Sequence, residues 1–351
     1  MTIKSTALPA AQRRHLLVGA LSALALNESR AQGGLGVSAP FRKISVISFG
    51  GGFNLPIWAA QDQGLFERRG LDVQHTITAD SKQVFTGMMD GRYHVAITAF
   101  DNILAYQEGQ GEVAFDPPSD FFAFMGSDDG FLSLVAAPSI KSFADLRGKT
   151  ISVDAMGNGF SFVLRDMLAR NGIAETDVRW ARAGGTDRRF AALMAGEHDA
   201  TMLRAPFDLQ ARSRGFNQLA TTRDTLGNYL GIVGAARRSW AAEHADSVIA
   251  FIKAYRDAVA LLELPGIRGH AQELLMRKVP GMDGALAARS CELLLDPASG
   301  FYADVRLDER GVQAVMALRS KLGGGAALTD ASRYMDRRYW LSAQRLSLIH
   351  I

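Results

Sequence analysis

The stretch ISVISFGGGFNLPIWAAQDQG (residues 44–64) predicts a buried strand, a glycine-rich turn and a helix in direct succession. Pro56 suits the first turn of that helix, and Gly64 suits its end. The alternation continues with a strand at 71–77, a helix capped by Ser81 and a strand at 95–97. This order implies a mostly parallel sheet covered by helices.

A similar order recurs later in the chain. Strands are predicted at 150–153, 178–181 and 200–203, with helices at 160–169 and 187–195 and a further helix opened by Pro206. The segment GRYHVAI (91–97) aligns with GEHDATM (196–202), and LDV (71–73) aligns with TDV (176–178) at the same offset. The shared offset indicates two related α/β lobes.

The predicted fold class is α/β, with two doubly wound lobes joined by two crossing strands. Two apolar stretches, 131–136 and 229–235, are the expected crossing strands. The first lobe then comprises 41–130 and 228–345, including helices near the C-terminus, and the second lobe comprises 131–227. The tail 347–351 continues no pattern.

The first 31 residues resemble an export signal rather than part of the fold. Arg13 and Arg14 precede an apolar run at 16–26, and the small-x-small pattern ends at Ala31, near which we expect cleavage. The run is shorter than the roughly 20 residues that span a bilayer. The arginine pair leaves both the Sec and the twin-arginine routes open. An amphipathic helix of a cytoplasmic enzyme is the alternative; export would place the protein in the periplasm.

Composition excludes several classes of function. The chain has 39 Lys and Arg against 36 Asp and Glu, and the excess lies in the predicted signal, so the charge gives no support to nucleic-acid binding. A single cysteine, Cys291, excludes a disulfide framework and a cysteine zinc site, and its apolar neighbours favour a buried thiol. Phosphate-binding, dinucleotide and nucleophile-elbow motifs are incomplete, and the histidines lack metal-ligand spacing. We expect no metal, no cofactor and no catalytic residues.

Candidate ligand-binding residues lie in loops at strand ends, because ligands of doubly wound sheets bind beyond the carboxyl ends of the strands. The candidates are Gly51, Phe53, Asn54, Thr98, Asp101, Ser127, Asp128, Gly157, Asn158, Gly159, Phe160, Ser161, Thr186, Arg204, Asn228 and Tyr229.

These candidates have several possible roles. Residues 156–161 can offer backbone N–H groups to an anion or can simply form a tight turn. Arg204 can pair with a carboxylate or sulfonate, or form a surface salt bridge. Phe53 and Tyr229 can stack on a ligand or close the core. The expected role of Asp101 is a helix cap, and Asp128, with its neighbour Asp129, leaves open a ligand that carries an amine.

Several segments resemble the sulfonate/nitrate/taurine-type substrate-binding proteins of ABC importers, which share the fold of thiamine-pyrimidine synthases. These segments are LPIWAAQDQGLF (55–66), GLDV (70–73), IKSFADLRGKTISV (140–153), LMAGEHDA (193–200) and RAP (204–206). The resemblance covers about residues 44–235. It implies a type II periplasmic binding protein in which the loops at 50–54, 98–101 and 157–161 line the cleft.

The resemblance implies a function without chemistry. Such a protein captures a small organic ligand, expected to be anionic, and presents it to a permease and ATPase complex in the inner membrane; we expect it to act as a monomer. The alternatives are an enzyme on the same fold and a sensory binding protein. Eukaryotic thiamine-pyrimidine synthases carry a cysteine-rich iron motif, and the single cysteine and the predicted signal oppose that alternative.

Overall fold

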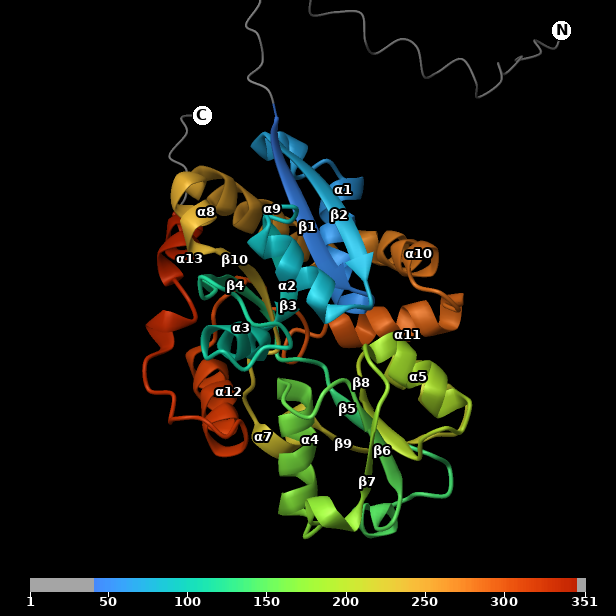
Figure 1. Ribbon diagram of the computed structural model, residues 1–351. Helices are drawn as coiled ribbons and strands as arrows, with labels where there is room; N and C mark the ends of the chain where they lie inside the picture. Colours follow the sequence, from blue (N-terminus) through green and yellow to red (C-terminus); the bar gives the residue numbers. More distant parts are fainter. Residues whose placement is uncertain (1–40, 346–351) are drawn as a thin grey trace, which may run out of the picture. The chain divides into compact units, whose positions relative to one another are not determined.

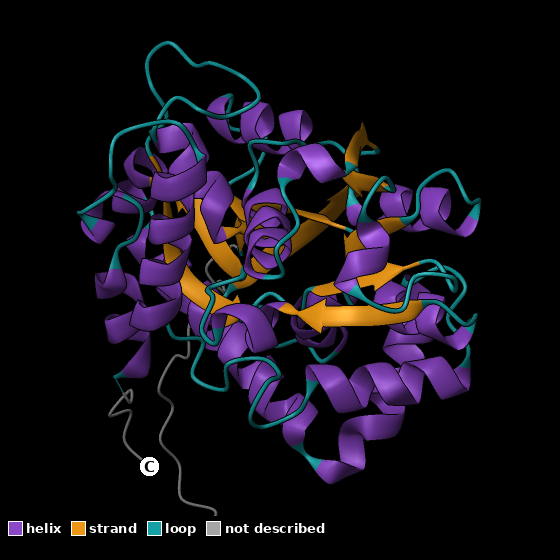
Figure 2. Ribbon diagram, turned by 90° about the horizontal axis from the view of Figure 1, so that it is seen from below, coloured by secondary structure: helices purple, strands orange, loops and turns teal. Residues whose placement is uncertain are grey.

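The computed structural model describes residues 41–345. The predicted signal at 1–31 and the tail at 347–351 lie outside the described residues. The described chain contains two five-stranded sheets surrounded by helices (Figures 1 and 2). The predicted α/β class with two strand–helix units is therefore confirmed.

The first sheet has the order β2-β1-β3-β10-β4. Its strands are β1 (Arg42–Phe49), β2 (Leu71–Thr78), β3 (Val95–Ala99), β4 (Phe121–Asp128) and β10 (Ile232–Arg237). Strand β1 runs parallel to β2 and β3, whereas β10 pairs antiparallel with β3 and β4.

The second sheet has the order β7-β6-β8-β5-β9. Its strands are β5 (Ser133–Ala136), β6 (Thr150–Val153), β7 (Arg179–Arg182), β8 (Ala200–Leu203) and β9 (Asn217–Thr221). Strand β6 is parallel to β7 and β8, and β5 is antiparallel to β8 and β9. Each sheet is therefore mostly parallel, as expected, because four of its five strands run in one direction; only the strand that enters the sheet after a crossing, β10 or β5, runs against its neighbours.

The helices fill the intervals between strands and the C-terminal part. They are α1 (Leu55–Asp62), α2 (Ser81–Met89), α3 (Phe100–Gln107), α4 (Gly159–Arg170), α5 (Thr186–Met194), α6 (Phe207–Ser213), α7 (Thr222–Leu226), α8 (Arg238–Glu243), α9 (Ala245–Glu263), α10 (Arg268–Lys278), α11 (Gly284–Leu294), α12 (Glu309–Leu322) and α13 (Arg337–Gln344). Short 3₁₀ turns cover Gly52–Asn54, Glu67–Arg69, Phe143–Leu146, Glu175–Asp177, Pro265–Ile267 and Ala331–Arg333.

Two predicted helix caps are wrong. Asp80, not Ser81, caps α2, because its carboxylate accepts a hydrogen bond from the Lys82 amide at 2.9 Å. Helix α3 begins at Phe100 with Ala99 as its N-cap, so Asp101 lies inside the first turn. The carboxylate of Asp101 is instead held by Arg319, which lies far along the chain on α12.

The chain passes between the sheets twice, from β4 to β5 and from β9 to β10. These crossings correspond to the two predicted crossing stretches, although strands β4 and β9 were not predicted. The two connections touch through glycine: a Cβ on Gly231 would lie 2.1 Å from the Cα of Gly130. Only glycine lets two backbones approach this closely.

Candidate ligand-binding site

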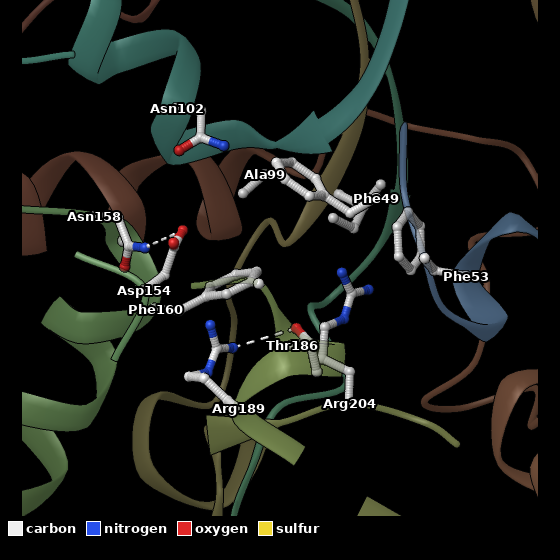
Figure 3. A pocket seen from close by; sticks show the side chains of 14 residues that line it. Phe49, Phe53, Ala99, Asn102, Asp154, Asn158, Phe160, Thr186, Arg189 and Arg204 are labelled. Atoms are coloured by element: carbon white, nitrogen blue, oxygen red, sulfur yellow. Dashed lines mark hydrogen bonds between the residues drawn. The ribbon is translucent and has the colours of Figure 1, made fainter. Parts of the chain in front are cut away.

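A pocket lies where loops from both sheets meet (Figure 3). It holds about 530 Å³ of space free of protein atoms, part of which is open to solvent. Residues that follow or end the strands of the first sheet line one side: Phe49, Gly50, Phe53, Ala99, Asn102 and Ile232. Residues of the second sheet's loops and helices line the other: Asp154, Asn158, Gly159, Phe160, Gly185, Thr186, Arg189 and Arg204.

Strand topology explains this position. Strands β1, β3, β6 and β8 each end at the pocket, and a loop or a helix begins there. The carboxyl ends of parallel strands place the following helix N-termini along one edge of a sheet, so that edge becomes the binding edge.

Arg204 has the most exceptional environment in the pocket. Its residue is 4% exposed, and its Nη2 lies 3.4 Å from the Oδ1 of Asp128. Within the described residues, its Nε has no hydrogen-bond partner. The guanidinium carbon lies 4.4 Å from the ring centroid of Phe53 and 5.8 Å from that of Phe160. Arg204 therefore presents unused donors between two aromatic rings.

The charge of Arg204 is maintained against the effect of burial. Burial lowers the pKa of the guanidinium from 12.5, whereas the carboxylates of Asp128 and Asp129 raise it. Burial removes the hydrogen bonds that a donor would make to water. An anionic acceptor beside an unpartnered buried donor replaces them. The arrangement therefore favours an anion beside Arg204.

Arg189 supports the wall of the pocket from α5. Its guanidinium donates to the carbonyls of Gly184 at 2.7 Å and Met202 at 3.1 Å, and to the Thr186 hydroxyl at 3.2 Å. Burial lowers its pKa to about 10, so it remains cationic at neutral pH. Because its donors already serve the protein, Arg189 contributes positive charge and holds the loop before α5.

Two helix N-termini reach the pocket. Asn158 caps α4, and its side-chain oxygen accepts from the Ser161 amide at 2.9 Å. Gly185 is the N-cap of α5 and makes no side-chain capping hydrogen bond. The first N–H groups of a helix have no partner within the helix, and the helix dipole places partial positive charge there. Both ends therefore add to the anion-binding character of the pocket.

Acidic groups oppose part of this positive charge. Asp154 lines the pocket, and burial raises its pKa although Arg189 lowers it. Asp128 is buried behind Arg204 and does not line the pocket, and burial raises its pKa as well. Asp129 lies 3.6 Å from Arg223 and borders two other cavities. The positive charge at the pocket is thus not in large excess.

Part of the predicted set comes together in this pocket: Phe53, Asn158, Gly159, Phe160, Thr186 and Arg204. Arg204 forms a buried ion pair with Asp128 rather than the surface salt bridge considered from sequence.

Four predicted residues are engaged in hydrogen bonds within the protein. Asn54 accepts from the Ser48 hydroxyl at 2.7 Å and donates to the Phe49 carbonyl at 2.8 Å. Thr98 accepts from the Asn102 amide at 3.0 Å, and Asn102 itself lines the pocket. The other two are Ser127, whose Oγ lies 2.9 Å from the hydroxyl of Tyr255, and Asp101, which is bound by Arg319.

The remaining predicted residues lie beside the pocket or away from it. Gly51 adopts φ 142°, which suits glycine in the turn before the pocket. Ser161 donates to the Ala155 carbonyl at 2.5 Å. Gly157 borders an adjacent cavity, and Asn228 and Tyr229 border a third one at the crossing segments. Tyr229 is buried in the core rather than placed on the pocket wall.

The strand-end loops expected from sequence are 49–54, 98–102, 126–129, 156–161 and 184–187, together with Arg204 and 228–229. Three pocket residues lie outside them: Asp154, Arg189 and Ile232. Asp154 comes directly after strand β6, so the strand-end argument could have included it. Arg189 sits within a correctly predicted helix, and no local signal shows that this cation is buried. Ile232 belongs to a crossing strand, and sequence does not reveal which of its residues faces the pocket.

Residues 41–345 contain neither a cluster of metal-ligating side chains nor a candidate membrane-spanning helix. Across residues 41–345, no group of three or more His, Cys, Asp or Glu side chains could hold a metal ion. None of the helices in this part of the chain combines the length and apolar composition needed to cross a membrane. Cys291 is a buried free thiol, as its apolar neighbours predicted.

Similarity to known proteins is consistent with this architecture. The periplasmic nitrate-binding protein NrtA from Synechocystis PCC 6803 aligns with a TM-score of 0.71 and 13% identity, covering 86% of this chain and 88% of that one. The alkanesulfonate-binding protein SsuA from Xanthomonas axonopodis pv. citri, bound to MOPS, aligns with a TM-score of 0.69 and 18% identity, covering 86% and 100%. The desulfurization enzyme DSZB aligns with a TM-score of 0.60 and 11% identity, covering 86% and 98%.

The fold is therefore that of the periplasmic binding proteins. The family model described as NMT1/THI5 like matches residues 54–263, and the chain belongs to this family. The resemblance noted in the sequence is confirmed. No curated protein matches the sequence.

Proposed function

We propose that the protein is the ligand-binding component of an ABC import system and captures a small organic anion of the sulfonate or carboxylate type. The observation that carries this proposal is the buried guanidinium of Arg204, which has an Nε without a partner in the described chain and lies between two aromatic rings at the pocket. The N-termini of α4 and α5 add two further sources of anion affinity. Structural neighbours named as nitrate-binding and alkanesulfonate-binding proteins support an anionic ligand.

The aromatic lining favours an organic ligand over a small inorganic ion. Phe49, Phe53 and Phe160 offer apolar surface that nitrate is too small to use fully. An organic body gains about 25 cal/mol for each Å² of apolar surface that it buries against them. The anionic group then fixes orientation, and the apolar body adds affinity.

We further propose that residues 41–130 with 228–345 form one lobe and residues 131–227 form the other. The membership of the strands in the two sheets supports this division. A ligand held by Phe53 on one side and Arg204 on the other favours the state in which both are close, because it binds that state better. The glycine contact between the crossing segments is the expected hinge.

The proposed location is the periplasm, which the protein reaches by the Sec or the twin-arginine route and where its signal is cleaved near Ala31. Its proposed partners are a membrane permease and the ATPase of that permease. The proposed working form is a monomer. N-terminal sequencing of the exported protein tests the cleavage site.

A thermal-shift screen of alkanesulfonates and of aliphatic and aromatic carboxylates tests the proposed ligand class. A ligand at about 100 times its dissociation constant stabilises the folded state by roughly 2.7 kcal/mol. For any hit, Arg204→Ala should weaken binding at least tenfold, whereas Arg212→Ala, an exposed arginine on α6, should leave affinity unchanged. Equal affinities for both variants and wild type would contradict the proposal.

Mass spectrometry of the ligand separates binding from catalysis. The neighbour DSZB shows that the fold also carries an enzyme. The proposal predicts that a hit is recovered chemically unchanged after long incubation with the protein. Steady consumption of the ligand would instead establish an enzyme.

A further inference from the structure

Arg204 forms its ion pair with a carboxylate that is fully buried. The Oδ1 of Asp128 lies 3.4 Å from the Arg204 Nη2 and accepts a hydrogen bond from the Gly130 amide at 2.8 Å. Among the described residues, no second cation lies within salt-bridge distance of Asp128, and its Oδ2 has no hydrogen-bond partner. The side chains of Arg204 and Asp128 are 5% and 0% exposed. The negative charge of Asp128 is therefore balanced by Arg204.

Two further carboxyl groups lie close to Arg204. Asp129 follows Asp128 in the chain, and Asp208 is on α6, where its amide donates to the carbonyl of Arg204 at 3.3 Å. Burial lowers the pKa of the guanidinium, and the charges of Asp128, Asp129 and Asp208 raise it. Three carboxyl groups thus lie near one buried arginine that also lines the ligand pocket.

Other charged and titratable side chains surround this cluster. They are Asp154 after β6, Arg189 on α5, Arg212 on α6, Arg223 on α7, Tyr255 on α9, and Tyr302, Arg306 and Asp308 in the segment 295–308. Burial raises the pKa of both tyrosines, which therefore keep their protons at neutral pH. Guanidinium groups remain cationic there. A proton that is exchanged near Arg204 at neutral pH therefore goes to or from a carboxyl group.

An anion in the pocket would compete with Asp128 for the charge of Arg204. One cation would then face two negative groups in a site that water reaches poorly. A second negative charge close to a carboxylate favours the protonated form of that carboxylate. Protonation of Asp128 leaves the charge of Arg204 to the anion, and the buried Oδ2 without a partner costs less in a neutral carboxyl than in a carboxylate.

Asp129 connects this site to water. Its side chain is 18% exposed and borders two cavities other than the ligand pocket. Burial and the charge of Asp128 raise the pKa of Asp129 to about 6. Interacting carboxyl groups titrate as a pair rather than separately. A proton can therefore reach the Asp128–Asp129 pair from solvent without passing a ligand in the pocket.

We propose that the protein captures its anion together with a proton, which the Asp128–Asp129 pair takes up. This inference rests on the proposed function and adds a second, cooperative ligand to it. The proton comes from the solvent and forms an O–H bond on the pair, so the site gains one charge of each sign. Affinity for the anion is therefore highest at low pH and falls as pH rises from the pKa of the free pair towards that of the pair beside the bound anion.

Calorimetric titration with propane-1-sulfonate, benzenesulfonate and benzoate tests the coupling, because all three probes are ionised between pH 6 and 9. Tris and triethanolamine buffers are not anions and differ in ionisation enthalpy, so titrations in both at pH 7.5 give the number of protons taken up. We expect about 0.4 proton or more per bound probe, and an affinity that falls at least about fourfold between pH 6 and pH 8. Zero uptake with an affinity independent of pH would overturn the proposal.

Asp128→Asn tests which group takes up the proton. The asparagine keeps an oxygen for the Gly130 amide but cannot change charge, so proton uptake should fall below about one third of the wild-type value and affinity at pH 8 should rise at least about threefold. Asp208→Asn is the matched control. It also removes a buried carboxyl that has an unpartnered oxygen, but Asp208 forms no ion pair with Arg204 within the described chain. This control should retain the wild-type uptake.

The outcomes separate the two proposals. If a probe binds and Arg204→Ala weakens it, but no proton is taken up, the proposed function stands and the proton coupling is wrong. If uptake persists in Asp128→Asn, or is lost in Asp208→Asn or Asp154→Asn, the assignment to the Asp128–Asp129 pair is wrong. If none of the three probes binds, both proposals fail for anions of this kind.

Infrared difference spectroscopy of wild type keeps the test valid if Asp128→Asn does not fold. Addition of propane-1-sulfonate or benzenesulfonate should produce the band of a newly protonated carboxyl group, and the same band should appear in Asp208→Asn. A bound sulfonate that produces no such band would overturn the proposal.

Discussion

Arg319 on α12 binds both carboxylate oxygens of Asp101 on α3, and both side chains are only 1% exposed. The same guanidinium donates to the carbonyl of Gly157 at 3.0 Å, in the loop that precedes α4. The side chain of Arg319 therefore joins α12, from the C-terminal part of the chain, to α3 and to a loop beside the pocket. Helix α12 also lies next to α4 (Figure 1).

Removing this arginine should destabilise the fold strongly. Arg319→Met leaves the Asp101 carboxylate buried without its partner, and such a change typically costs about 3–5 kcal/mol. Urea denaturation measures the loss. Arg92→Met, which removes an exposed pair with Asp90, is the control and should leave the free energy of unfolding nearly unchanged, because solvent screens such a pair. A loss below about 1 kcal/mol for Arg319→Met would mean that this pair does not stabilise the fold.

The stacking of Arg204 on Phe53 should contribute to ligand affinity. Phe53→Leu keeps an apolar side chain but removes the ring 4.4 Å from the guanidinium, and a cation–π contact between buried groups such as these is worth about 2 kcal/mol. We expect affinity for an anionic ligand to fall by at least fivefold in calorimetry. Phe190→Leu removes a comparable arginine contact, with Arg214, away from the pocket and should not change affinity. Equal effects of both substitutions would argue against a role for Phe53 in orienting Arg204.

A side chain at Gly159 should disturb the approach of α4 to α3. A Cβ at this position would lie 2.4 Å from the Cβ of Asp101, a distance that real side chains do not adopt. Gly159→Ala should therefore weaken ligand binding by at least tenfold, because the helix must move away from the pocket. The matched control is Gly284→Ala, also the first residue of a helix, where no atom of the described chain lies within 4 Å of the added methyl. Wild-type affinity in Gly159→Ala would show that this contact is not needed for binding.

The buried carboxyl of Asp208 should make stability depend on pH. Burial raises its pKa from 3.8 to about 6, and its Oδ1 has no partner in the described part of the chain. An acid whose pKa is higher in the folded state stabilises the fold below its unfolded pKa, and this contribution is lost as pH rises through about 6. Asp208→Asn should therefore match wild type near pH 4 and exceed its free energy of unfolding by about 2–3 kcal/mol near pH 8. Denaturation at both pH values measures this; a constant difference across the range would contradict the assignment.

The periodic parts of the fold could be predicted from sequence. The strand at 44–48 and the helix that begins at Leu55 follow from hydrophobic pattern, proline and glycine, and these signals are local. Strands β4 and β9 were missed for different reasons. Strand β4 is buried along its whole length, so it shows no alternation, and β9 is short and only partly buried.

The site was predictable only where it follows strand ends. Arg204 comes directly after a predicted strand, Gly159 and Phe160 lie where the loop after another predicted strand enters a helix, and all three line the pocket. Asp101 illustrates the limit, because its partner Arg319 lies on α12 and no local pattern connects the two positions. Arg189 is a second example of this limit. Its buried guanidinium donates to the carbonyl of Met202, and only the tertiary fold brings these two residues together.

The most direct test of the central claim is the crystal structure of the protein with a sulfonate or carboxylate that passes the binding screen. We predict that the anionic group lies within hydrogen-bond distance of the Arg204 Nε and near the N-terminus of α4, with its body against Phe53 and Phe160. A ligand bound elsewhere, with the Arg204 Nε still without a partner, would contradict the claim that these two sheets hold an anion between them.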